Sequence, residues 1–481
     1  MVNEIKLVIE ARYDDLKVPI IKNKELSKEI NESYINGEQF DSTEEIRLYE
    51  NKLYYITLKI KRPLTNCKEL FSSCYFIKII HIDLSSFEPG EIVDMSKMFY
   101  CCSELVSVNF ANFNSSKLTN MSEMFYKCSN LKEIKMSFFN TINVIDMSGM
   151  FSHCGLEYIQ FPPLNSINLK NMKRMFSYCP NLKNVDFSSF NTEQVEDMSY
   201  LFEGCKNLEN IDFSKLNTQN VVTMEGMFYD SNLINNNNLS SLKCDKVKNF
   251  SFFFSKCENL NNNHLSSLKA IIYNMSHFFE GCDLTNLNLS KINTEYLVNM
   301  DYCFAECKNI EINQNSSLLN LKNCLSMSHT FYESDLSKVN FSFLDSKNVE
   351  NMEYCFAKCK NIKTNENSVL KAKNCIKSKY MFYRNNLNDV NFSFLDLRNA
   401  EDMEYCFAEC KNIKINENSA LNTKNCINMD YAFYKTDLNN VNFSFLYTQN
   451  VKSMKYCFAE CENIKINEKS ILNTIICNNI L

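Results

Sequence analysis

A phenylalanine recurs along this chain at a nearly constant step, in most cases with a cysteine three residues after it. Successive members of this series, called anchors below, lie 25 to 28 residues apart. A period of this length is typical of arrays in which each unit cannot bury its apolar face alone and therefore stacks on its neighbours. The pattern predicts one long solenoid instead of several globular domains. The sixteen anchors are Phe71, Phe99, Phe125, Phe151, Phe176, Phe202, Phe228, Phe254, Phe279, Phe304, Phe331, Phe356, Phe382, Phe407, Phe433 and Phe458.

The repeat around Phe202 shows how one unit is expected to fold. Its apolar side chains before the strand are Val195, Met198, Leu201, Phe202 and Cys205. Their spacing places them on one face of a short helix. Ile211 and Phe213 follow, two residues apart, as in a strand that turns one face inward. Each unit is therefore predicted to be a helix, a strand and a return loop, which makes the fold an α/β solenoid.

Two further residue types recur at fixed places in the repeat. Methionine is soft and unbranched, so it suits a stack whose neighbours vary slightly. Asparagine in a repeated loop can satisfy backbone groups of its own or of the next unit. The methionines four residues before an anchor are Met95, Met121, Met147, Met172, Met198, Met224, Met275, Met300, Met327, Met352, Met403, Met429 and Met454. The loop asparagines are Asn114, Asn140, Asn165, Asn191, Asn217 and Asn293.

Residues 1–62 lack the repeat and are predicted to form a small β-rich N-terminal cap. Strands are expected over residues 4–11, 16–21 and 53–60, which alternate apolar and polar residues or carry β-branched ones. Residues 63–481 are assigned to a solenoid of about sixteen units. The chain ends just inside a further unit, and no C-terminal cap is expected.

The later repeats form a two-unit module copied in tandem, and each copy carries two cysteines four residues apart. A thiolate metal site is one interpretation, with Cys324, Cys375 and Cys426 as further ligands. Core packing is the preferred interpretation, because the pairs are spread over tens of residues and free cysteine behaves as a small buried hydrophobe. Free thiols, without disulfides or metal, are therefore expected. The pairs are Cys303/Cys307, Cys355/Cys359, Cys406/Cys410 and Cys457/Cys461.

Charge and hydropathy exclude several classes of partner. With 51 basic and 57 acidic side chains, the formal charge of −6 gives no general attraction to nucleic acid or anionic membranes. We find no apolar run of 18 residues, signal-peptide pattern or lipid-anchor tail, so membrane insertion is not expected and the sequence alone predicts a cytoplasmic protein. The sequons beginning at Asn249 and Asn274 each have a core residue in the middle, where a glycan would hinder packing.

The run from Asn191 to Leu216 (NTEQVEDMSYLFEGCKNLENIDFSKL) resembles the leucine-rich repeat of the BspA-like surface proteins, in the variant first noted in mycoplasmas. The resemblance covers roughly residues 64–477. It implies a leucine-rich-repeat-like solenoid in a cell-surface or secreted protein that adheres to host or matrix proteins, without catalytic residues. The chain departs from the pattern where Ser334, Asn385 and Thr436 replace the cysteine.

No constellation of catalytic residues is apparent, so catalytic, cofactor-binding and metal-binding residues are all predicted to be absent. The five histidines lie in different units and are expected at the surface or beside the helices, and none of the seven glycines builds a phosphate-binding loop. His277 and His329 share one place, two residues before their anchors. The other histidines are His81, His153 and His264.

A non-enzymatic scaffold that binds a protein partner is therefore the first hypothesis for function. Its recognition surface is expected to use outward strand positions, with exposed aromatic residues as anchors for affinity. These positions include Lys132, Glu133, Lys183, Asn184, Glu209 and Asn210. A structural or spacer protein inside the cell is the alternative. An enzyme with an unrecognised site is third, because the sequence shows no converging group of reactive residues.

Overall fold

In the computed structural model, the chain divides into two compact units, residues 1–246 (unit 1) and 247–481 (unit 2). The described residues are 3–14, 16–19, 24–41, 45–72, 77–88, 91–110, 116–135, 140–160, 166–209, 211–233, 239–268, 270–285, 287–312, 319–341, 344, 346–363, 372–387, 397–413, 423–438 and 446–462.

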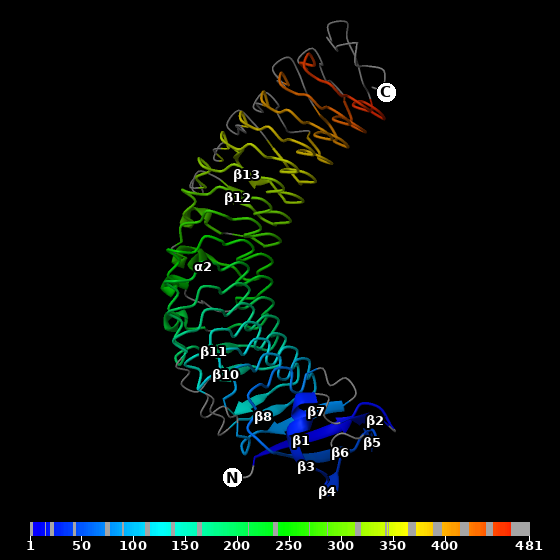
Figure 1. Cartoon of the computed structure of the whole chain (residues 1–481). Helices are drawn as coiled ribbons and strands as arrows, with labels where there is room; N and C mark the ends of the chain where they lie inside the picture. The colour runs from blue at the N-terminus through cyan, green and yellow to red at the C-terminus, as the bar shows by residue number, and fades with distance from the viewer. Residues whose placement is uncertain are drawn as a thin grey trace. The chain divides into compact units, whose positions relative to one another are not determined.

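A seven-stranded sheet opens unit 1, with the strand order β4-β3-β6-β1-β7-β8-β9. Figure 1 shows its strands side by side near the N-terminus. β1 lies antiparallel between β6 and β7, and β7 pairs in parallel with β8, the strand of the next repeat. A second, two-stranded sheet joins β2 to β5. The elements are β1 (Glu4–Ala11), β2 (Leu16–Pro19), α1 (Lys24–Glu29), β3 (Ile30–Ile35), β4 (Glu38–Phe40), β5 (Glu45–Leu48), β6 (Leu53–Ile60), β7 (Ile77–Asp83), β8 (Ser107–Asn109) and β9 (Glu133–Lys135).

The sequence therefore predicted the N-terminal sheet correctly in its main strands. The strands expected over residues 4–11 and 53–60 are β1 and β6, and the strand expected over residues 16–21 is the shorter β2. Alternation along β6 buries every second side chain, including Ile56 and Leu58. The expected domain boundary after residue 62 falls between β6 and β7, two strands of one sheet.

The helix predicted in each repeat is wrong. From Met198 to Cys205 the main chain forms successive turns, in which Leu201 N–H bonds Met198 O and Cys205 N–H bonds Phe202 O. The amide of Phe202, between these turns, points to Met227 O of the next repeat, 3.0 Å away. A right-handed helix would need every amide to bond four residues back within its own segment. Here alternate amides join neighbouring repeats instead, and the same pattern recurs through both units.

Among the described residues, the strand predicted after the turns is found in several repeats. It is present as β8, β9, β10 (Tyr158–Gln160) and β11 (Asn184–Asp186) in unit 1, and as β12 (Glu311–Ile312) and β13 (Lys338–Val339) in unit 2. In the repeat of Phe202 the described residues 211–213 form no strand, and Phe213 begins a short 3-10 helix, η1 (Phe213–Lys215). The remaining elements are η2 (Leu239–Ser241), α2 (Asn262–Ser267) and η3 (Leu289–Lys291). Among the described residues α1 and α2 are the only α-helices.

The anchors fill the core of each unit, as predicted. All sixteen have an exposed fraction of 4% or less. Within each unit their rings stack face to face on the next anchor, as Phe125 does on Phe151 with centroids 5.5 Å apart. The methionines four residues before the anchors are also buried, including Met198 and Met300 at 0%. The apolar face was therefore identified correctly even though the helix was not.

Most of the described cysteines three residues after the anchors are buried and donate their thiol. Cys154 Sγ lies 3.0 Å from Phe125 O, the carbonyl of the preceding anchor, which also accepts the main-chain amide of Cys128. The same bond recurs at Cys128, Cys179, Cys205, Cys282, Cys307, Cys359, Cys410 and Cys461. Burial raises the pKa of Cys154 well above its usual value, so the thiol keeps its proton. The described cysteines form no disulfide.

A column of asparagine and aspartate caps the turns and was not identified in the sequence. Five residues before an anchor, Asp146 Oδ1 accepts the amide of Ser148 at 2.7 Å, while its main chain bridges to Asn120 and Asn171 in the adjacent repeats. Asn249 and Asn274, the sequon residues, make the same bond, and Phe250 and Met275 beside them are fully buried. A short polar side chain at this place satisfies the first amide of the turn.

The loop asparagines play the structural role that was predicted for them. Asn191 Oδ1 accepts the amide of Glu193 at 3.0 Å. The main-chain carbonyl of Asn217 accepts a bond from the hydroxyl of Thr192 in the preceding repeat, and the amide of Asn217 donates to the same hydroxyl. Asn140 and Asn293 make the corresponding bond to the second residue after them. Asn114 and Asn165 lie outside the described residues.

Candidate functional site: a column of stacked aromatic rings

Nine consecutive repeats of unit 2 carry an aromatic or imidazole ring two residues before the anchor. These rings stack in eight successive pairs, with centroids 4.1 to 5.1 Å apart and planes inclined by 4° to 27°. We call them the ring column. Its members are Phe252, His277, Tyr302, His329, Tyr354, Tyr380, Tyr405, Tyr431 and Tyr456.

The main-chain conformation and hydrogen bonding fix the position of each ring. All nine residues have a positive φ, between 54° and 60°, which a right-handed helix does not allow. The amide of each of the seven residues from His277 to Tyr431 bonds a carbonyl of the next repeat, as Tyr380 N does to Glu404 O at 3.0 Å. Because the backbone steps are regular and the side chains leave at the same angle, the rings lie directly over one another.

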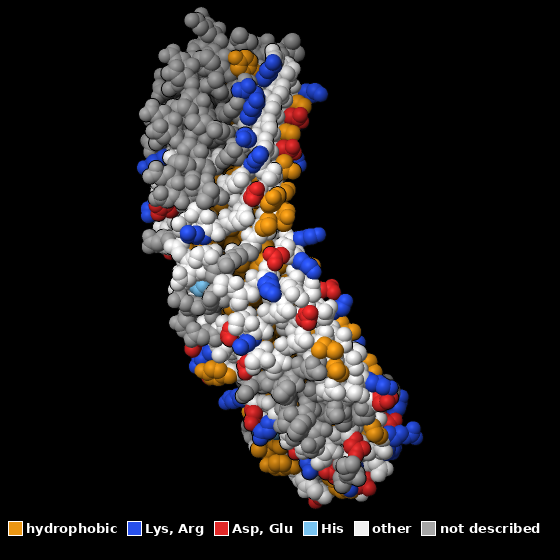
Figure 2. Space-filling model, turned by 90° about the vertical axis from the view of Figure 1, so that its left-hand side faces the viewer, with side chains coloured by type: hydrophobic (Ala, Val, Ile, Leu, Met, Phe, Trp, Pro, Cys, Tyr) orange, Lys and Arg blue, Asp and Glu red, His pale blue; other side chains and the backbone are white. Residues whose placement is uncertain are grey.

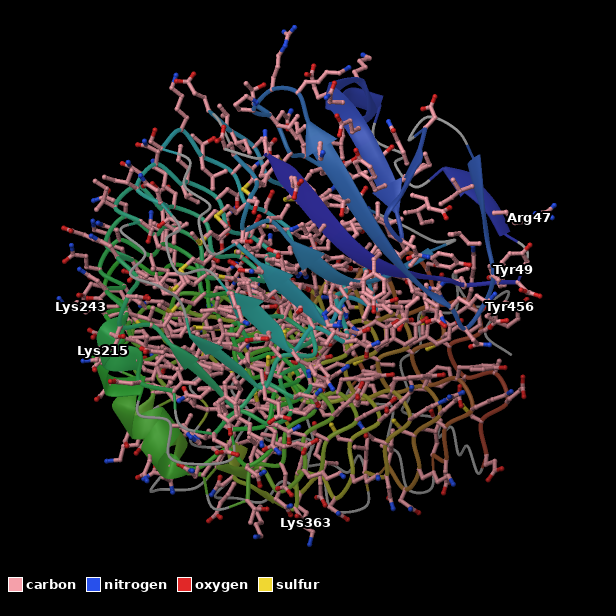
Figure 3. All side chains as sticks on the ribbon, turned by 90° about the horizontal axis from the view of Figure 1, so that it is seen from below. Arg47, Tyr49, Lys215, Lys243, Lys363 and Tyr456 are labelled. Atoms are coloured by element: carbon pink, nitrogen blue, oxygen red, sulfur yellow. The ribbon has the colours of Figure 1, made fainter. Side chains whose placement is uncertain are left out.

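The rings are partly exposed, with their edges rather than their faces toward solvent. Eight of the nine side chains are half-buried, and Tyr456 is 47% exposed. Figure 3 shows the labelled Tyr456 at the outer margin of the repeats. Stacking covers the faces, so what remains available is a strip of ring edges and phenolic hydroxyls.

Burial between neighbouring rings changes the acidity of the column. It raises the pKa of Tyr302, Tyr354 and Tyr405 above the usual value of 10.0, so these hydroxyls remain protonated donors. It also lowers the pKa of His329 from 6.5 to about 4, with a smaller contribution from His277. At neutral pH His329 is therefore an uncharged ring, like the tyrosines on either side.

Ion pairs lie beside the ring column. Arg384 lies 2.8 Å from Glu409, and Tyr383 donates its hydroxyl to the same carboxylate at 2.8 Å. Tyr383 also meets the ring of Tyr380 edge-on, with centroids 5.3 Å apart. The arrangement recurs one module later, where Tyr434 and Lys435 both contact Glu460.

A further ion-pair group includes Lys379, directly before Tyr380 in the chain, which lies 2.8 Å from Glu404 and 3.2 Å from Asp402. The column is thus an apolar strip beside charges of both signs. Protein interfaces combine such a tyrosine-rich centre with a polar rim.

Unit 1 does not continue the column. At the same place it carries Lys97 and Glu123, which form an ion pair of 3.5 Å, and Arg174, which lies over the ring of Tyr200 at 4.5 Å. Gly226 follows, where an added Cβ would come within 2.4 Å of the Tyr200 ring. In the described residues the ring column is therefore a property of unit 2.

The outward strand positions predicted for recognition lie in unit 1. Lys132, Glu133 and Asn184 are exposed, while Lys183 and Glu209 are half-buried. Lys183 is occupied by an ion pair of 3.4 Å with Glu157, and Asn210 lies outside the described residues. The structure thus places the described members of this set as separate surface side chains on the repeats of Phe125, Phe176 and Phe202.

The histidines occupy four different environments. His277 and His329 share the ring column, as their common place in the repeat predicted, although no helix carries them. His81 is exposed and His153 stacks on Tyr178. The surface prediction is wrong for His264, which is fully buried and caps α2 together with Asn261.

The paired cysteines are packed as hydrophobes. Cys303 and Cys307 are buried, and Cys307 donates its thiol to Phe279 O. Burial raises the pKa of Cys324, Cys375 and Cys426 to about 12. In the part of the chain that the structure describes, no three His, Cys, Asp or Glu side chains group closely enough to hold a metal ion.

A search of the same residues for a helix long and apolar enough to cross a membrane finds none.

Comparison with known proteins gives one match. A family model described as "Mycoplasma protein of unknown function, DUF285" matches four tandem stretches, residues 65–161, 156–268, 269–369 and 376–474. No curated protein and no solved structure matches the chain.

Proposed function

Because the chain belongs to the DUF285 family, of which it carries four tandem copies, we propose that it is a non-enzymatic scaffold that binds a protein partner. We further propose that its repeats form a leucine-rich-repeat-like solenoid of the BspA type, and that the protein acts as a surface adhesin. The resemblance of the run from Asn191 to Leu216 supports these finer assignments. The shared backbone bonds between repeats are consistent with a solenoid.

The single observation that carries protein binding is the ring column. Tyrosine is enriched at protein interfaces because one ring offers a large apolar area and a polar tip. Rings that already stack on both neighbours lose little freedom when a partner covers them, which removes part of the entropic cost of association. The strip extends over nine repeats, so it suits an extended partner better than a compact small molecule.

The test replaces two tyrosines of the column by lysine. Unit 1 carries Lys97 at the equivalent place, also with positive φ, so lysine is compatible with this backbone. Tyr354→Lys combined with Tyr405→Lys is expected to weaken binding to the captured partner about 30-fold or more, because central interface tyrosines contribute about 2 kcal/mol or more. Tyr158→Lys is the matched control, since Tyr158 is 61% exposed but lies in unit 1 outside the column.

The measurement is surface plasmon resonance of each variant with proteins captured from matrix extract and, separately, from cytoplasmic extract. Equal binding of the double variant and the control would remove the ring column as the recognition surface. Absence of any saturable partner in both extracts would favour the structural or spacer role. Selective capture from the matrix extract would support adhesion.

A further inference from the structure

Five consecutive repeats of unit 2 carry a basic side chain nine residues before the anchor. We call these residues, all of which are exposed, the basic row. At the same place three earlier repeats carry the acidic residues Glu193, Asp245 and Glu295, the first repeat carries Arg62, and the others carry uncharged residues, so consecutive positive charges occur in this stretch. Figure 2 shows a row of basic side chains over the C-terminal repeats. The members are Lys322, Lys347, Lys373, Arg398 and Lys424.

A tight turn presents each basic residue to solvent. The amide of Cys324 bonds Leu321 O at 2.9 Å, which closes a four-residue turn with Lys322 second and Asn323 third. Leu321 and Cys324 are both fully buried, so the two central residues of the turn point outward. The other four basic residues occupy the second place of an equivalent turn, closed by bonds of 2.9 to 3.1 Å.

Asparagines align the row from one repeat to the next. Asn348 Nδ2 donates to Lys322 O at 2.7 Å, and Asn450 Nδ2 donates to Lys424 O at 2.7 Å. A bond of 3.0 Å from Asn425 Nδ2 to Asn399 Oδ1 joins the last two turns of the row. These bonds tie the Lys322, Arg398 and Lys424 turns to the repeats that follow them, which helps to fix the spacing of the charged side chains. At about 4.8 Å a step, five charges extend over about 19 Å.

The surroundings of the row restrict its partners. None of the five turns contains an aromatic residue, so the row lacks the stacking platform that single-stranded nucleic acid uses. Glu350 and Glu401, both exposed, stand three residues after Lys347 and Arg398. These carboxylates would face a flat anionic membrane together with the row and repel it. A narrow linear chain can instead follow the row and avoid the acidic residues.

We propose that the basic row binds a linear polysaccharide that carries sulfate groups. Ammonium and guanidinium groups form charge-assisted bonds with such oxyanions, and the regular spacing allows several to bind one chain at once. The turn asparagines, exposed at Asn323 and Asn425 and half-buried in the other three turns, offer neutral groups beside them for sugar hydroxyls. This binding surface is separate from the ring column and stands whether or not the column binds a protein.

The test uses a heparin-derived octasaccharide as the probe and the full chain, by isothermal titration calorimetry at about 50 mM salt, where such charge contacts are strongest. The double variant Lys373→Glu with Arg398→Glu is expected to bind about tenfold or more weakly, which corresponds to about 1.4 kcal/mol or more. Both side chains are exposed at turn tips, so the melting temperature should stay close to that of the parent. Lys373→Arg should retain binding.

Lys360→Glu with Lys411→Glu is the matched control. These exposed lysines line a separate hollow of about 480 Å³ in the same unit, and the variant changes the net charge by the same amount. Unchanged affinity in this control supports the row. Equal loss in both double variants would assign binding to general surface charge and overturn the proposal. No saturable binding of the octasaccharide, or tighter binding of oligodeoxythymidylate or phosphatidylserine vesicles, would overturn it as well.

Discussion

The thiol of Cys359 donates a hydrogen bond to the main-chain carbonyl oxygen of Phe331, which lies 2.8 Å away in the preceding repeat. Asn385 Nδ2 and Thr436 Oγ1 donate equivalent bonds of 2.7 Å to Phe356 O and Phe407 O. Ser231 and Ser334 do the same in their repeats. All residues that replace the cysteine therefore keep a donor. The place requires a compact side chain with a polar hydrogen, and sulfur itself is not essential.

Cys359→Ala should lower the free energy of unfolding by about 1–2 kcal/mol, because one buried hydrogen bond and some packing are lost. Cys359→Ser should recover most of this loss, since its hydroxyl can donate to Phe331 O. Urea denaturation followed by circular dichroism measures both values. If alanine and serine destabilise the protein equally, the hydrogen bond contributes nothing and only packing of the sulfur matters.

Phe202→Ala should cost about 3–5 kcal/mol, because it empties a fully buried site between two repeats. The Phe202 ring stacks on Phe176 and Phe228, with centroids 5.8 and 6.0 Å away. Lys183→Ala, at a half-buried place in the same unit, is the control and should have little effect. Thermal denaturation compares the two. If Phe202→Ala melts at the same temperature as the parent while Lys183→Ala melts at a lower temperature, the inward and outward faces are reversed.

Tyr405→Gly should be more stable than Tyr405→Ala by about 1 kcal/mol, although glycine usually destabilises a protein relative to alanine. Both changes remove the stacking on Tyr380 and Tyr431, but only alanine has a Cβ to strain the backbone at φ 55°. Thermal and urea denaturation of the two variants give the difference. Greater stability of the alanine variant would show that the positive φ is not retained in solution.

Stability should fall as the pH is lowered from about 6.5 toward 4, because the pKa of His329 is about 4 in the folded chain and near 6.5 when it unfolds. Between pH 6.5 and 4 the unfolded chain binds this proton more readily than the folded chain, so acid favours unfolding. Above pH 6.5 His329 is neutral in both states, and its full contribution to stability is restored. His329→Tyr, which restores the commonest ring of the column, should reduce the slope. Melting temperatures across this pH range test the idea, and identical slopes in parent and variant would contradict it.

The sequence predicted the period, the buried columns and the N-terminal sheet, because burial depends on spacing that a single repeat already shows. Val195, Met198 and Phe202 are fully buried as expected. The helix was wrong because the same spacing also fits successive turns. What separates the two is the partner of each amide, and Phe202 N bonds Met227 O, 25 residues further along the chain. Local periodicity contains no information about that partner.

The ring column was visible in the sequence but was not recognised. His277 and His329 were seen to share a place, and Tyr354, Tyr405 and Tyr456 stand there in the later modules. The missing step was to follow that place through every repeat as the anchors had been followed. Even then, the stacking of the rings depends on a positive φ at each residue, which tyrosine rarely adopts and which its sequence does not signal.

The antiparallel pairing of β1 with β7 also bears on aggregation. β1 occupies the hydrogen-bonding groups on one side of residues 77–83, so another chain cannot add a strand there. Shortening the chain from the N-terminus past Ala11 would leave that row of amides and carbonyls as an open template. Truncated protein would then be prone to oligomerise edge to edge. β1 therefore protects against fibril growth in addition to its part in the sheet.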